Sequence, residues 1–407
     1  MFENIIGHKG ITSFIQKEVI QGIFPPAVLL TGEPYSGKLS IALEIARILS
    51  CTKNSSWGCE CKYCLSHRDL SYPYFTMVGW RYFEEDIMVA SRAFQRQPNN
   101  GTYHLFVRSI RKLLLRFDSL SVDGDKPLPL VTSTLDIIRE LIEELLIESD
   151  SATLKKKCQI IEEHVKKLLN LIKTKNIAIN QIIKIHSWLT LSSPSVKILI
   201  IENAEFINES SGNAMLKMLE EPAENSQIIL LASRAELLSN TLRSRLREYP
   251  LCKRTEIEEK KVLNDIFRIE VEGFKSLKEY FQLSTMNEPE FISSLVNDFM
   301  EYVTGNGTIR HEIKKKNREN YRLLASHESS VSNKMMMLFF EKILMILRQR
   351  LMRNQEVDLI LKLVDEINKF QNRYLQLSIQ PRYVLSSLSL SMREIYIAFF
   401  DNNPINS

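Results

Sequence analysis

A short segment near the N-terminus has the residue types and spacing of a phosphate-binding loop. Residues 32–38 read Gly-Glu-Pro-Tyr-Ser-Gly-Lys and lie between an apolar run and a stretch whose apolar residues recur at helical spacing. In a P-loop, backbone N–H groups at the start of a helix surround phosphate oxygens, and the lysine reaches the outer phosphates. Gly32, Gly37 and Lys38 are therefore candidate nucleotide-binding residues. The next position, where Mg²⁺ needs a hydroxyl, holds Leu39, which predicts a degenerate loop.

A second predicted strand is followed by two residues that differ from those an ATPase needs at this place. Hydrolysis requires an aspartate that anchors Mg²⁺ through water and a neighbouring glutamate that orients the attacking water. The apolar run 196–201 is followed instead by Glu202 and Asn203. Glu202 can still contact a metal, whereas the amide of Asn203 cannot act as a base. The alternative interpretation, that Glu202 and Asn203 are only polar residues at the end of a strand, fits nearly as well. Two defects, at Leu39 and Asn203, favour a chain that does not hydrolyse ATP, and whether it binds ATP stays open.

Four of the six cysteines crowd into one segment, at Cys51, Cys59, Cys61 and Cys64. Structural zinc takes four thiolates in a tetrahedron, and two cysteines separated by two residues have the usual knuckle spacing. We therefore predict a structural Zn²⁺ site with no position left open for water. The single residue between Cys59 and Cys61 is a tight gap, so unligated or redox-active thiols are the alternative.

Arg245 is a further candidate for chemistry, because it follows Ser244 shortly after the predicted sheet ends. A guanidinium can contact two phosphoryl oxygens at once and stays charged at every working pH. A single arginine is usually a solvated surface residue. In this position we instead predict an arginine finger that acts on a nucleotide bound by a neighbouring subunit.

The elements that must position these residues form a predicted parallel α/β sheet. Short buried strands at 27–31, 196–201 and 228–231 alternate with helices, one of which spans 210–221 and is ended by Pro222. Strands that alternate with helices are typical of a parallel sheet. We predict that this base domain occupies residues 1–252 and carries the cysteines in the segment 51–64.

Helical spacing of apolar residues dominates the rest of the chain. It predicts a helical insertion at about 82–175, with a turn at 121–127, a small helical lid at 253–290 and an all-α collar, used for oligomerisation, at 291–407. A basic helix is expected around Arg108–Arg116. Its cations either grip DNA phosphates or form the solvated face of an amphipathic helix, and the second interpretation is favoured.

Size and composition set outer limits on function. A chain of 407 residues exceeds one ordinary domain, and 44% hydrophobic with 25% charged residues is usual for a globular protein. A net charge of +4 does not indicate a dedicated nucleic-acid binder. The N-terminus has no secretory signal pattern, and no apolar run approaches the ~20 residues of a membrane span. These features predict a cytoplasmic protein.

Together the motifs resemble the clamp-loader branch of the AAA+ ATPases, and most closely its bacterial DNA polymerase III delta-prime subunits. The most specific string, Asn-Ala-Met-Leu-Lys-Met-Leu-Glu-Glu-Pro at 213–222, is similar to the family's, and so is the Ser-Arg pair at 244–245. Residues 2–8 and the four cysteines also resemble the family pattern. Ser233 stands where the family keeps a polar phosphate sensor. The resemblance covers residues 1–81 and 176–251, and the insertion is foreign to it.

The resemblance implies a function for the whole chain. It implies a non-catalytic stator subunit that assists ATP-driven loading of a sliding clamp onto primed DNA. Its partners would be gamma/tau-like and delta-like subunits in a hetero-oligomeric ring, the sliding clamp, and primer–template DNA reached through the complex. One alternative is an ATP-hydrolysing subunit of the gamma/tau type, and another is a zinc-bearing DNA-binding module.

Overall fold

A computed structural model describes most of the chain. The described residues are 1–79, 81–117, 129–145, 150–171, 176–269, 276–284, 289–305, 316–317, 319–322, 324, 329–352, 356–377 and 379–402. The chain divides into two compact units, Met1–Phe281 and Gln282–Ser407. The predicted limits of the lid and the collar, at 252 and 290, stay predictions. Among the described residues, no helix is long and apolar enough to span a membrane.

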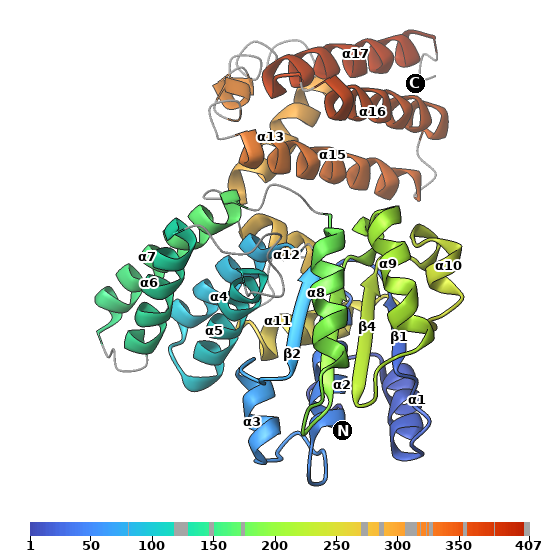
Figure 1. Cartoon of the computed structure of the whole chain (residues 1–407). Coiled ribbons are helices and arrows are strands. Elements are labelled where there is room, and N and C mark those ends of the chain that lie inside the picture. Colours follow the sequence, from blue (N-terminus) through green and yellow to red (C-terminus); the bar gives the residue numbers. More distant parts are fainter. Residues whose placement is uncertain are drawn as a thin grey trace. The chain divides into compact units, whose positions relative to one another are not determined.

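A five-stranded parallel sheet forms the centre of the first unit (Figure 1). Its strands are β1 (Ala27–Thr31), β2 (Phe75–Gly79), β3 (Lys197–Glu202), β4 (Ser226–Ala232) and β5 (Arg247–Pro250), in the order β2-β3-β4-β1-β5. Every residue of β1 to β4 is buried. Because both faces of these strands are covered, they read as continuous apolar runs rather than alternating ones. The predicted strands β1, β3 and β4 are confirmed, and β2 and β5 are additions.

Helices cover both faces of this sheet (Figure 1). Alternate residues of a strand point to opposite faces, so Leu30 of β1 packs with α1 (Lys9–Ile20) and α2 (Lys38–Ser50), whereas Leu29 packs with α8 (Ile179–Thr190) and α9 (Glu209–Glu220). The sheet order and the loop between β1 and α2 give an AAA+-like fold. In such sheets the carboxyl ends of the strands carry the ligand site.

The predicted insertion lies between β2 and β3 and has a hydrophobic core of its own. It contains α4 (Phe83–Arg96), α5 (Asn100–Leu114), the short helix η1 (Leu115–Phe117), α6 (Pro129–Leu145) and α7 (Ser151–Leu171). The helical character predicted for this segment agrees with the structure, in which Ile138 and Ile142 of α6 and Leu154 and Ile161 of α7 lie in this core. The turn predicted at 121–127 lies outside the described residues.

Short helices complete the first unit, and long helices make up the second. The first unit also contains α3 (Lys62–Arg68), η2 (Ala204–Phe206), η3 (Ala235–Leu237), α10 (Asn240–Arg243) and α11 (Glu256–Asp265). The helix α12 (Leu277–Ser284) packs with α11 and with Val89 of α4 through a small apolar core. The second unit contains α13 (Pro289–Thr304), α15 (Ser329–Leu351), α16 (Val357–Leu377) and α17 (Pro381–Asn402), which agrees with the predicted helical C-terminal region.

Candidate functional site

The loop between β1 and α2 has the backbone of a phosphate-binding turn. The helix α2 begins at Lys38, and Gly37 before it has φ 95°. This positive φ favours glycine, and a Cβ atom here would also displace the Arg254 side chain, whose Nη2 atom would lie 2.3 Å away. The Lys38 ammonium donates to the carbonyl oxygens of Gly32 and of Glu33, at 2.9 Å for the second. Burial lowers the pKa of Lys38 to about 8, against the opposing effect of nearby Glu205 and Glu202.

Two side chains contact the backbone of this loop: Arg254, which no motif indicated, and His8, which ends the family-like segment 2–8. Arg254 donates to the carbonyl oxygens of Ile6, at 3.0 Å, and Tyr35, at 2.9 Å. The Nε2 atom of His8 lies 2.7 Å from the carbonyl oxygen of Ser36. No sequence pattern marks Arg254, because its contacts join positions far apart in the chain.

The structure places no hydroxyl where the magnesium ligand of a P-loop is expected. Leu39 is 6% exposed and packs into the core between α2 and the sheet, whereas Ser40 is exposed. Within the loop itself, the Ser36 hydroxyl is buried and has no hydrogen-bond partner among the described residues. The Leu39 defect predicted from sequence therefore has a packing role of its own.

The carboxylate of Glu202, at the end of β3, forms an ion pair with an arginine side chain. Its Oε1 atom lies 2.6 Å from Nη1 of Arg81, and the same guanidinium contacts Asp86 at 2.6 Å. The close approach of β2 and β3 makes this possible, because a Cβ atom at Gly79 would lie 2.0 Å from the carbonyl oxygen of Glu202. Lys112 adds a second cation, 3.3 Å from Asp86. The Glu202 carboxylate is thus neutralised by Arg81, and this ion pair competes with its use as a magnesium ligand.

The basic helix predicted around Arg108–Arg116 faces inward, which corrects both interpretations of it. Lys112 pairs with Asp86, and Nη1 of Arg111 donates to the carbonyl oxygen of Asp69 at 2.5 Å. Burial lowers the pKa of Lys112 to about 8 and that of Arg116 to about 10, although Asp86 and Glu202, respectively, act in the opposite direction. Lys112 and Arg111 of α5 are thus paired within the chain and Arg116 of η1 is largely buried, so these cations form neither a solvated face nor a free surface for DNA.

The residues after β3 and β4 interact with each other. Asn203 has φ 48°, a left-handed conformation that asparagine tolerates better than most residues. Ser233, the predicted phosphate sensor, donates from its hydroxyl to Glu205 at 2.7 Å. Glu205 was not indicated by the sequence. Its other carboxylate oxygen is buried without a hydrogen-bond partner among the described residues.

The four cysteines of the predicted zinc site come together. The sulfur atoms of Cys51, Cys59, Cys61 and Cys64 all lie within 4.8 Å of one another. The Cys51 sulfur is 3.7 Å from that of Cys59 and 3.9 Å from that of Cys61. Four thiolates at ~2.3 Å from one zinc ion are separated by about 3.8 Å, so the arrangement fits a tetrahedral structural ion.

Local hydrogen bonds support this cluster. Cys61 is the N-cap residue of α3, and its sulfur accepts from the backbone N–H of Cys64 at 3.4 Å. Burial tends to raise the pKa of Cys61, but such N–H donors outweigh it and lower the pKa to about 6. From α2, the buried Arg47 pairs with Glu44 at 2.6 Å and donates to the Cys64 sulfur at 3.1 Å. The site therefore depends on α2 as well as on the cysteine segment.

Arg245 lies between α10 and β5 and is held by its own chain. Its Nε atom donates to Glu220 of α9 at 2.7 Å, and its Nη1 atom donates to the carbonyl oxygen of Thr241 at 2.7 Å. The side chain is 31% exposed. A role toward a neighbouring phosphate therefore requires Arg245 to leave Glu220.

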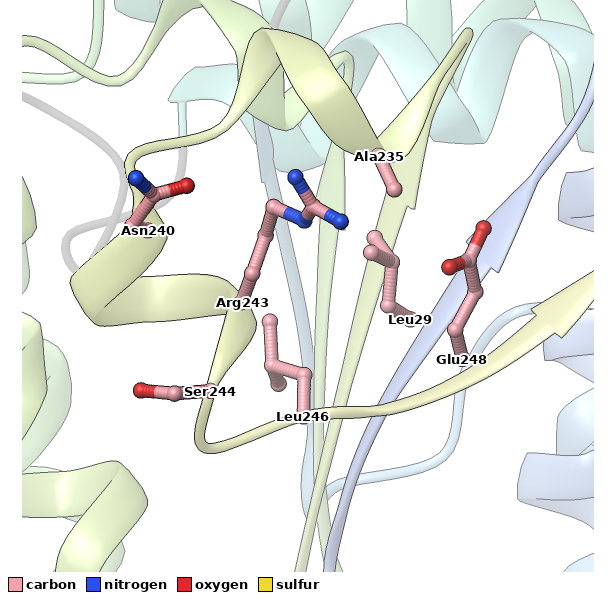
Figure 2. Close-up of a pocket in the computed structure, with 7 residues that line it drawn as sticks. All are labelled: Leu29, Ala235, Asn240, Arg243, Ser244, Leu246 and Glu248. Carbon is pink, nitrogen blue, oxygen red and sulfur yellow. The ribbon is translucent and has the colours of Figure 1, made fainter.

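A pocket of about 330 Å³ lies beside this segment and not at the P-loop. Figure 2 shows its lining side chains, with Arg243 and Glu248 on opposite sides of Leu29. Glu248 also accepts a hydrogen bond of 2.6 Å from the Thr31 hydroxyl. The pocket is thus part of the β5 edge that also carries Arg245.

Comparison with known proteins finds one family whose model matches part of this chain. Residues 131–255 match the family described as DNA polymerase III, delta subunit, a segment that includes α6, α7 and Arg245 but neither the P-loop nor the cysteines. The solved structure of a DNA polymerase III gamma-subunit-related protein from Thermotoga maritima is 18% identical, with 55% of this chain and 81% of that chain covered and a TM-score of 0.31. That likeness is too low to carry an argument. No curated protein matches the chain. The match over residues 131–255, less than half of the chain, shows that this segment is similar to the DNA polymerase III delta subunit family.

Proposed function

We propose that this chain is a non-hydrolysing, delta-prime-like stator subunit of a DNA polymerase III clamp loader. In this role it joins gamma/tau-like and delta-like subunits in a ring and assists the ATP-driven placement of a sliding clamp on primed DNA. The observation that carries the proposal is the ion pair between Arg81 and Glu202, at 2.6 Å. It uses the carboxylate that would otherwise anchor magnesium.

Three further features support the same role. Leu39 offers no metal ligand, and Asn203 offers no base. Arg245, in contrast, is kept and lies next to an exposed edge strand, β5. A chain that has lost its own hydrolytic residues but keeps an arginine for a neighbour is suited to a stator. We also propose that the four cysteines hold one structural zinc ion.

The second candidate function is an ATP-hydrolysing subunit of the gamma/tau type. The family match favours neither candidate, because the matched residues, 131–255, do not include the P-loop. The ion pair of Glu202 counts against the second. The zinc-bearing DNA-binding module is less supported, because the basic residues of α5 are packed inward.

The isolated chain is expected to hydrolyse ATP no faster than background. Phosphate release by the purified zinc-loaded chain measures this directly. The companion variant carries Leu39→Thr, Glu202→Asp and Asn203→Glu together. This variant is the matching gain-of-function test, although the left-handed backbone at 203 disfavours glutamate by roughly 1–2 kcal/mol. Turnover of ~1 s⁻¹ or more by the unmodified chain would make the gamma/tau type the better assignment.

A further inference from the structure

The helix α7 of the insertion has one apolar side and one basic side. Its apolar side packs against α4 and α6 in the core of the insertion (Figure 1). Its other side is exposed and carries four lysines, Lys155, Lys156, Lys166 and Lys167. Eleven residues, or three helical turns, separate Lys155 from Lys166. The two lysine pairs therefore lie on the same side of the helix, about 16 Å apart.

The positive charge of these four lysines is not neutralised within the chain. None of their ammonium groups forms an ion pair or a side-chain hydrogen bond with another described residue. Carboxylates at the flanks of α7 already have cations, because Glu144 of α6 pairs with Lys157 at 3.1 Å and Glu162 interacts with Arg92 of α4. Within α7, all of which the structure describes, Glu163 is the one exposed acidic residue.

The basic surface is limited to α7. The neighbouring helix α6 carries exposed acidic residues instead, among them Glu140 and Glu143. A partner of this surface must therefore place negative charge along α7 itself, over the three turns that separate the two lysine pairs.

The side chains between the lysines indicate what kind of polyanion fits. No large apolar side chain of α7 is exposed. A helix that binds a membrane surface inserts an apolar face, and protein interfaces depend on buried aromatic or aliphatic anchors. The helix has no Phe, Tyr or Trp on which the bases of a single strand could stack. Repeated cations without such anchors fit the backbone of duplex DNA, which carries one negative charge per about 1.7 Å of its axis.

We propose that the exposed side of α7 binds the phosphate backbone of duplex DNA, independently of base sequence, through Lys155, Lys156, Lys166 and Lys167. The proposal goes beyond the stator role, because it concerns a surface that is separate from the P-loop, the cysteine cluster and Arg245. It rests on charge and exposure within the insertion, and it does not require the chain to join a ring.

The test is a titration of a fluorescently labelled DNA duplex with the full zinc-loaded chain, followed by anisotropy at several salt concentrations. Each lysine–phosphate contact releases counterions, so the logarithm of the binding constant falls against the logarithm of the salt concentration with a slope of about −0.9 per contact. Four contacts therefore contribute about −3.6 to this slope. A labelled single strand of the same length and anionic phospholipid vesicles are the comparison probes, and both should bind more weakly than the duplex.

One variant combines Lys155→Gln, Lys156→Gln, Lys166→Gln and Lys167→Gln. Because each lysine accounts for about one unit of slope, this variant should lose about three to four units and bind the duplex at least tenfold more weakly at low salt. The matched control removes the same net charge from four exposed lysines outside the insertion, by Lys9→Gln, Lys17→Gln, Lys253→Gln and Lys261→Gln. It should keep most of the slope. Glu163→Gln removes the one exposed carboxylate of α7 and should tighten binding severalfold.

Zinc content and thermal unfolding confirm that each variant is folded, which is expected because glutamine favours helices about as well as lysine. The inference is overturned if the unmodified chain does not bind the duplex, if the two fourfold variants lose slope equally, or if Glu163→Gln leaves binding unchanged. Tighter binding to the single strand or to vesicles assigns the surface to another partner and overturns it as well. None of these results affects the stator role, which is tested by hydrolysis and by the ring.

Discussion

Arg245→Ala is expected to lower the DNA- and clamp-stimulated ATPase activity of a reconstituted clamp loader by about tenfold or more. Arginine fingers contribute about 10³–10⁵ in rate in the best-studied phosphoryl-transfer systems, because the guanidinium meets negative charge that develops in the transition state. The effect on a complete ring should be smaller, since several sites share the work. Steady-state phosphate release by the mixed complex is the measurement.

The chain itself should tolerate the substitution. Arg245 is 31% exposed and its partner Glu220 is 49% exposed, and pairs of this kind contribute only about 0–1 kcal/mol to folding. Zinc content, thermal unfolding and ring assembly should therefore be unchanged. Arg245→Lys should rescue little of the activity, because an ammonium group cannot span two phosphoryl oxygens.

Glu220→Gln is the matched control, because it weakens the intrachain contact of Arg245 but keeps the arginine. A ring that contains this variant should retain its ATPase activity. If the alanine variant of Arg245 instead supports full ATPase activity and clamp loading, Arg245 is an ordinary surface arginine and the predicted finger is wrong.

Replacing Cys61 or Cys64 by serine should release zinc and unfold the segment 51–64 locally. Structural zinc binds with apparent free energies of about 10–16 kcal/mol in small knuckles, and this binding is coupled to folding of the surrounding loop. Besides zinc, the loop is held by Arg47 and Arg68, which donate to its carbonyl groups, and by Glu3, which accepts from the backbone N–H of Trp57. Metal analysis measures the zinc, and hydrogen exchange of residues 51–64 measures the unfolding.

The unmodified chain should carry about one zinc ion, as structural tetrathiolate sites do. Cys252→Ser is the matched control, since Cys252 is exposed and lies outside the cluster. It should change neither zinc content nor hydrogen exchange. Freshly purified, reduced chain without zinc would contradict the assignment of the four cysteines.

Local patterns determined a large part of this protein. The buried strands β1, β3 and β4 follow from continuous apolar runs, and the helix faces of α6 and α7 follow from apolar residues at helical spacing. The cysteine cluster follows from spacing, because two cysteines separated by two residues, as at Cys61 and Cys64, are typical of structural zinc sites. The strand β2 was not predicted from the sequence, because it lies beside the helical insertion. The strand β5 was not predicted either, because only Tyr249 of its four residues is buried and the strand therefore has no apolar run.

The electrostatics of the site were decided by tertiary structure alone. Arg81 and Glu202 are 121 residues apart in sequence, and they meet because β2 and β3 are neighbours in the sheet and Gly79 lets the strand ends approach. The inward packing of Lys112 and the closure of Arg254 over the loop have the same origin. Residue types and spacing identify which groups can bind phosphate or metal. Which of those groups remain free to do so depends on long-range pairing, because a charge buried in a fold is stabilised by whichever partner the topology brings to it.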